Sequence, residues 1–203
     1  MSHTIRNITI AAAVVCAVCA NVTRAQESGE APPDMAAMMA QYAELATPVA
    51  EHESFKELVG EWTSQEKMWM DPSAPPTESE ATVTFRLILG GRYLIQDYTS
   101  EFMGQTFHGM GITAFDKFRQ EYISLWIDDM STGMFIARGK ADSTGRTITY
   151  TGTMDDPLAG QKDIPIRNVA RQIDADTQVF EMYRPGPDGK EFKMMEMTYT
   201  RKK

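Results

Sequence analysis

Alternating apolar and polar residues are frequent in the chain from Glu61 onward. Ten short segments are expected to be strands, and several of them carry this period of two, which is typical of β-strands with one face toward a core. Beyond residue 60 no segment has the three-to-four residue spacing of a helix. The ten expected strands are Glu61–Met70, Glu78–Leu89, Arg92–Glu101, Gln105–Phe115, Glu121–Asp128, Met134–Ala141, Thr147–Met154, Lys162–Ile173, Thr177–Arg184 and Glu191–Arg201.

Short turn sequences separate these strands. Examples are the glycine pair at 90–91, DSTG at 142–145 and PGPDG at 185–189. Glycine supplies positive φ in such turns, and aspartate bonds the nearby backbone. Short turns connect antiparallel neighbours, and ten such strands must close on themselves or leave open edges. We therefore expect an all-β fold, an antiparallel up-and-down barrel of about ten strands spanning residues 52–203.

Two short helical segments are expected before the barrel. Asp34 can cap a helix over Met35–Ala46, which is rich in Met, Ala, Gln and Glu. Phe55, Leu58 and Val59 are spaced as one helical turn facing a core. The acidic stretch before Asp34 contains adjacent prolines, so residues 26–51 are expected to form a disordered acidic leader followed by the short helix.

Residues 1–25 have the pattern of a secretory signal peptide. Ile8–Ala20 carries no charge over thirteen residues, which suits a signal core and is too short for a transmembrane helix. Cleavage is expected after Ala25, with Ala20 as the competing site. A lipoprotein is disfavoured because valine precedes both Cys16 and Cys19. The domain is expected to be exported and soluble, in a periplasm or outside the cell.

The cysteine content and the net charge limit the disulfides that the domain can form and the partners that it can bind. Both cysteines lie in the expected signal peptide, so the exported domain can form no internal disulfide. The whole chain has a net charge of −8, and removal of two basic residues with the signal makes it more acidic. An acidic surface repels phosphate, so nucleic acid is excluded as a partner and anionic membranes are disfavoured.

The first and last strands resemble those of calycin barrels, the lipocalins and fatty-acid-binding proteins. Gly60-x-Trp62 follows a helical turn, and Arg201 lies in the last strand. The resemblance implies that Trp62 closes one barrel end beneath the Arg201 cation.

Residues 52–203 also resemble the predominantly bacterial Domain of Unknown Function 1579 family, which implies the barrel fold and no established activity. The matching stretches are LVGEW (58–62), MWMDPSAPP (68–76), ILGGRYLIQDY (88–98), GITAFD (111–116), WIDDMSTG (126–133), TGTMDDP (151–157) and FEMYRPGPDGKEFKMMEMTYTRK (180–202).

A barrel of this size has more interior than its own side chains easily fill. We expect it to bind a small apolar or amphipathic molecule without catalysis. The side chains expected to line the interior are Arg86, Gln96, Tyr98, His108, Trp126, Arg138, Glu181 and Glu196. Two alternatives stay open: a filled barrel with a structural or partner-binding role, and a hydrolase or isomerase with His108 or Glu196 as base.

No catalytic set, metal site or cofactor is expected. The exported domain has no cysteine and no G-x-S-x-G motif. Haem-binding calycins use a histidine near the C-terminus, where this chain has Glu196, Thr198 and Tyr199. Methionine pairs such as Met68 and Met70 suit copper(I), but residues two apart on a strand simply share one face.

Overall fold

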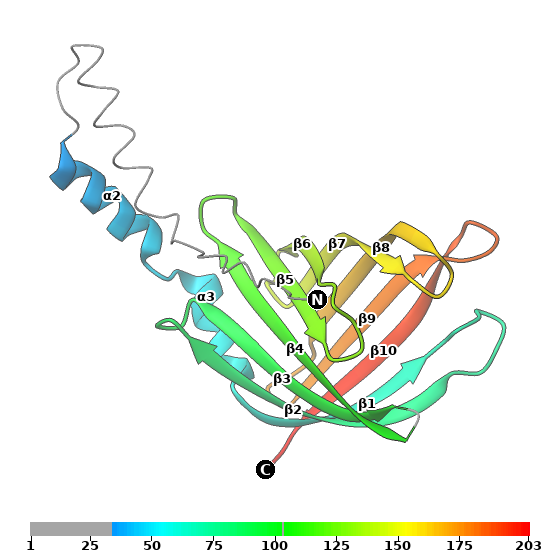
Figure 1. Cartoon of the computed structure of the whole chain (residues 1–203). Coiled ribbons are helices and arrows are strands. Elements are labelled where there is room, and N and C mark those ends of the chain that lie inside the picture. The colour runs from blue at the N-terminus through cyan, green and yellow to red at the C-terminus, as the bar shows by residue number, and fades with distance from the viewer. Residues whose placement is uncertain (1–33, 103) are drawn as a thin grey trace, which may run out of the picture. The chain divides into compact units, whose positions relative to one another are not determined.

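A closed ten-stranded antiparallel barrel forms the core of the protein in a computed structural model, which describes residues 34–102 and 104–203 (Figure 1). Each strand pairs with its neighbours in sequence, and β1 closes the barrel against β10. The strands are β1 (Gly60–Met68), β2 (Thr77–Ile88), β3 (Tyr93–Phe102), β4 (Gln105–Asp116), β5 (Glu121–Asp128), β6 (Phe135–Ala141), β7 (Thr147–Asp156), β8 (Gln161–Gln172), β9 (Thr177–Pro185) and β10 (Glu191–Arg201).

The all-β barrel predicted from the sequence is confirmed, with strand ends within two residues of the expected ones. The expected signal peptide, and the leader as far as residue 33, lie outside the described residues.

Helix α2 (Met35–Ala46) has the predicted bounds. The Asp34 carboxylate accepts hydrogen bonds from the backbone N–H groups of Ala36 and Ala37, at 3.0 and 3.2 Å. These bonds satisfy donors that the first turn of a helix otherwise leaves unpaired. Helix α2 belongs to a unit that ends at Thr47, and the barrel unit begins at Pro48.

Two short helices lead into the barrel, α3 (Ala50–Ser54) and the 3₁₀ helix η1 (Phe55–Leu58). Phe55 is buried, and its ring meets the edge of Tyr122 at a centroid distance of 6.3 Å. His52 is also buried and lies 5.7 Å from Phe115. Val59 is exposed instead of facing the core, because the chain is already extended there on its way into β1.

Alternation along the strands divides the residues between an inner and an outer face. The pairing register places Trp62 beside Val83 and Arg201, and Phe115 beside Tyr122. The inner face of β5 carries Tyr122, Ser124, Trp126 and Asp128. The buried core is therefore rich in aromatic rings, with Trp62, Phe85, Tyr98, Phe115, Tyr122, Tyr150 and Tyr199 as its large members.

Candidate functional site

The barrel encloses a cavity of about 500 Å³, which is the scale of small-molecule sites. Its mouth lies among η1, the β6–β7 turn and the β8–β9 turn, which contribute Leu58, Arg146 and Ala175. The inward-facing wall consists of Phe85, Leu94, Gln96, Thr113, Ser124, Ile148, Tyr150, Ala170, Gln172, Gln178, Phe180 and Tyr199.

Every residue of that wall is uncharged. Apolar side chains and side chains with hydroxyl or amide groups both line it, so the cavity offers apolar contact together with several hydrogen-bonding groups. The charged residues of the lining belong to the mouth, and they are Glu57, Arg146, Arg171 and Asp174. An ion placed against the wall would therefore find no opposite charge, and burying an unpaired charge is costly.

Several polar wall groups already have partners. Gln96 Nε2 donates to the Tyr199 hydroxyl over 3.3 Å, and that hydroxyl donates to Met197 Sδ over 3.4 Å. Gln172 Nε2 donates to the Asp174 carbonyl over 2.8 Å. Gln178 differs, because its buried Nε2 has no hydrogen-bond partner among the described residues.

Two wall tyrosines stay protonated at neutral pH. Burial raises the pKa of Tyr150 and that of Tyr199 above the ordinary range, because a low-dielectric site disfavours the phenolate. Both phenols are therefore neutral hydrogen-bonding groups.

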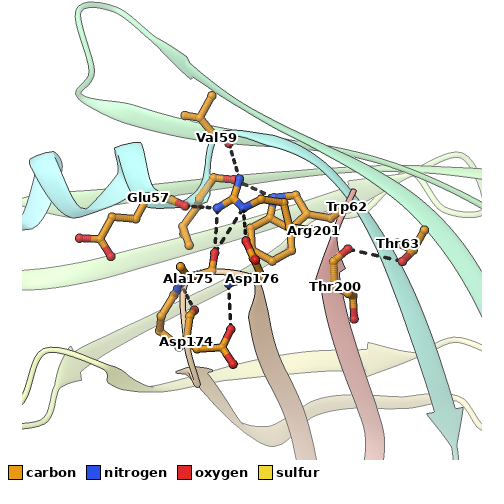
Figure 2. A network of polar contacts seen from close by, with 11 residues as sticks. Glu57, Val59, Trp62, Thr63, Asp174, Ala175, Asp176, Thr200 and Arg201 are labelled. Atoms are coloured by element: carbon orange, nitrogen blue, oxygen red, sulfur yellow. Dashed lines mark hydrogen bonds and ion pairs between the residues drawn. The ribbon is translucent and has the colours of Figure 1, made fainter. Parts of the chain in front are cut away.

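Arg201 closes the barrel beside the mouth (Figure 2). Its guanidinium lies 4.2 Å from the centre of the Trp62 ring, as the calycin resemblance implies. It donates to the Val59 carbonyl over 2.8 Å and to the Ala175 carbonyl over 3.1 Å, and it also bonds the Glu57 carbonyl. One side chain thus ties η1 and the β8–β9 turn to the last strand.

A second polar group lies on the inner face outside the lining of this cavity. The Glu66 carboxylate accepts hydrogen bonds from the Tyr98 and Ser79 hydroxyls. Burial, reinforced by the bond to Glu66, raises the pKa of Tyr98. The Tyr98 ring meets Trp126 edge-on at 5.5 Å, and Trp126 Nε1 donates to Asp128 over 3.0 Å.

Three of the eight residues expected in the interior lie on the inner face. Gln96 lines the cavity, while Tyr98 and Trp126 belong to the second inner group.

The other five lie on the outer face, so their expected placement in the interior is corrected. Arg86 pairs with Asp97 at 2.8 Å, and Arg138 pairs with Glu121 at 2.6 Å. The Arg86 side chain is 48% exposed and that of Arg138 is 50% exposed. Each arginine occupies an outward position between inward neighbours, and charge is solvated there at little cost.

His108, Glu181 and Glu196 complete the outer set. His108 is exposed, and its Nδ1 lies 3.2 Å from the Thr99 hydroxyl. Glu181 points to the outer side of the barrel but is buried there, and its carboxylate bonds Arg171 and Lys193. Lys193 also bonds Glu196. Residues paired across neighbouring strands share a face, and Glu196 is paired with Lys67 on one side and with Glu181 on the other. All three side chains therefore point outward.

Residues 47–201 match the model of a protein family described as a protein of unknown function, DUF1579. The chain belongs to the DUF1579 family. The comparison with curated proteins found no significant match for this DUF1579 protein.

Among solved structures, Rv2717c from M. tuberculosis is similar over all of its own chain and 77% of this one, at 15% identity and a TM-score of 0.57. This likeness concerns the fold. A redesigned β-barrel matches with 13% identity and a TM-score of 0.40, covering 73% of this chain and 95% of its own. A DUF3598 family protein from Nostoc punctiforme has 15% identity and a TM-score of 0.36, covering 72% and 48%.

The sequence prediction missed most of the wall of the DUF1579 barrel. Thr113, Ser124, Tyr150, Gln178 and Tyr199 line the cavity and were not among the eight. Alternation was a usable signal for Tyr150, which follows the inward Ile148 by two residues. Gln178 precedes Phe180 by two and shares its face in the same way.

Within the described part of the DUF1579 chain, no group of three His, Cys, Asp or Glu side chains is arranged to hold a metal ion. Among those same residues, no helix has the length and apolar character needed to cross a bilayer.

Proposed function

We propose that this protein binds a small apolar or amphipathic molecule in the barrel cavity and performs no chemistry on it. The observation that carries the proposal is the cavity of about 500 Å³ with its uncharged wall, in which apolar side chains stand beside hydroxyl and amide groups. Such sites gain affinity from burying the apolar part of a ligand, and a few polar groups fix its orientation.

The two alternatives have less support. A filled barrel requires a closed core, and the cavity argues against it. A hydrolase or isomerase requires a base that opens into the interior. The two bases considered were His108, which is exposed, and Glu196, which bonds Lys193 on the outer face.

The test is a fluorescence titration of the purified full-length chain with Nile red, an uncharged dye whose emission rises in apolar surroundings. Ala170→Phe places a ring in the cavity, and we expect at least tenfold weaker binding. Ser124→Phe, from a different strand, is a second filling variant. Thr82→Phe, on the exposed outer face of β2, is the matched control and should bind within twofold of the parent.

Circular dichroism of each variant checks that the barrel is intact. Equal Nile red binding by the parent and by a folded filling variant would place the dye elsewhere and reject the cavity as the site.

We also propose export, supported by the uncharged Ile8–Ala20 core and the small residues before Gln26. Intact-mass measurement and N-terminal sequencing of protein recovered from outside the cytoplasm should give Gln26 as the first residue. Recovery of the chain only from the cytoplasm, with Met1 or Ser2 at its start, would reject the proposal.

A further inference from the structure

We infer that the ligand is an uncharged amphiphile with a hydrogen-bond acceptor, such as a carbonyl, that Gln178 binds inside the barrel. This inference rests on the proposed binding function and names the class of ligand for the same cavity.

Gln178 is the wall group that calls for a ligand atom. Strand pairing with Tyr199 and Gln172 turns its side chain inward, and it lines the cavity. Its Nε2 is buried without a partner among the described residues. Buried donors in proteins are nearly always paired, and an unpaired donor costs stability. An acceptor on the ligand would satisfy this one.

The neighbouring polar groups fit the same ligand. Gln172 Nε2 already donates to the Asp174 carbonyl, and Gln96 Nε2 to the Tyr199 hydroxyl, whereas Gln178 Nε2 has no partner among the described residues. The Tyr150, Ser124 and Thr113 hydroxyls also line the cavity. Each can donate to a second acceptor lone pair or accept from a ligand hydroxyl.

Charge disfavours an anionic amphiphile such as a fatty acid. The wall has no cationic side chain, and the lining at the mouth contains as many carboxylates, Glu57 and Asp174, as arginines. Arg171 is moreover bonded to Glu181. The chain as a whole has a net charge of −8, which repels anions.

Competition against Nile red tests the inference with three probes that share one alkyl chain: methyl decanoate, decanoate and decane. Apparent affinities are corrected for the affinity of each variant for the dye. We expect methyl decanoate to bind at least tenfold more tightly than decanoate. Gln178→Leu, which keeps the size and removes the amide, should weaken methyl decanoate about tenfold and leave decane unchanged, as expected for loss of a buried hydrogen bond. Gln65→Leu, on the exposed outer face of β1, is the control.

Two results would overturn the inference. One is decanoate binding as tightly as the ester, with Arg146→Gln weakening it, because the head group would then be an anion held at the mouth. The other is methyl decanoate binding unchanged by Gln178→Leu. Absence of Nile red binding by the parent chain is a different result, and it would count against the proposed function itself.

Discussion

Gly109 faces the indole ring of Trp126 across the inner surface of β4 and β5. A Cβ built on Gly109 would lie 2.2 Å from Trp126 Cζ2 and 2.5 Å from Cη2, distances that real Cβ atoms do not reach. The missing side chain allows Trp126 to lie against β4, where it meets Tyr98 and bonds Asp128. The backbone φ of Gly109 is not positive, so the backbone conformation does not require glycine there. Glycine is needed because any side chain would collide with the Trp126 ring.

Gly109→Ala should therefore destabilise the barrel by about 1 to 3 kcal/mol, the usual cost of overpacking a core. Chemical denaturation followed by tryptophan fluorescence measures the free energy of unfolding. Gly133→Ala is the matched control, because a Cβ there would meet no atom within 4 Å. A Gly109→Ala free energy equal to that of the control would contradict the account of this contact.

The sequence predicted the positions of some side chains in the barrel correctly and those of others wrongly. Trp62 and Arg201 were assigned correctly because the resemblance to calycin barrels covers the first strand and the last strand together. His108 and Glu196 were assigned to the interior for their chemistry, although each stands between residues of the inner face. Phe107 and Gly109 flank His108, while Met195 and Met197 flank Glu196. Alternation was the better signal at both positions.

At the scale of the strands, the outer surface of β8, β9 and β10 is held by an ion-pair cluster centred on Glu181. Its carboxylate bonds Arg171 and Lys193, and Lys193 also bonds Glu196 and lies 5.6 Å from the Trp69 ring. Burial by itself would raise the pKa of Glu181, but the hydrogen bonds from Lys193 and Arg171 outweigh it and hold this pKa below its usual value.

The lowered pKa of Glu181 gives the direction of a pH effect. A carboxyl with a depressed folded-state pKa stabilises the fold above its unfolded pKa, and that contribution is lost as pH falls through the folded pKa. Glu181→Gln should cost about 1.5 to 3 kcal/mol at pH 7, the range for hydrogen bonds to a charged group. The free-energy difference from the parent should shrink below about pH 4.

Unfolding free energies of parent and variant from pH 3 to 7 measure this difference, with the exposed Glu101→Gln as control. A difference that stays constant over the whole range would show that the Glu181 charge contributes nothing.

The positions of the strands were predictable because alternation and turn residues are local signals. Which residues of a strand point inward was not predictable for every strand. In β5 the inner face carries Tyr122, Ser124 and Trp126, and the outer face carries Ile123 and Leu125. Neither set is plainly the polar one. The outcome depends on how the strand pairs with β4 and β6, and pairing across strands is information that a single strand does not contain.

For the whole molecule, closure of ten strands explains both the fold and the cavity. Pairing of β1 with β10 removes the free sheet edges that would otherwise promote aggregation. The resulting circumference is wider than the inner side chains can fill, which leaves about 500 Å³ open. The sequence predicted the closure and an interior that its own side chains do not fill, but the wall residues followed only from the register that closure imposes.

The most direct measurement of the central claim is a high-resolution crystal structure of the protein grown with methyl decanoate. We expect density for the alkyl chain between Leu94, Ile148 and Phe180, with the ester carbonyl accepting a hydrogen bond from Gln178 Nε2. A cavity closed by rotated wall side chains, or filled only by water at saturating ligand, would contradict the account and leave the outer surface of the barrel to explain the function.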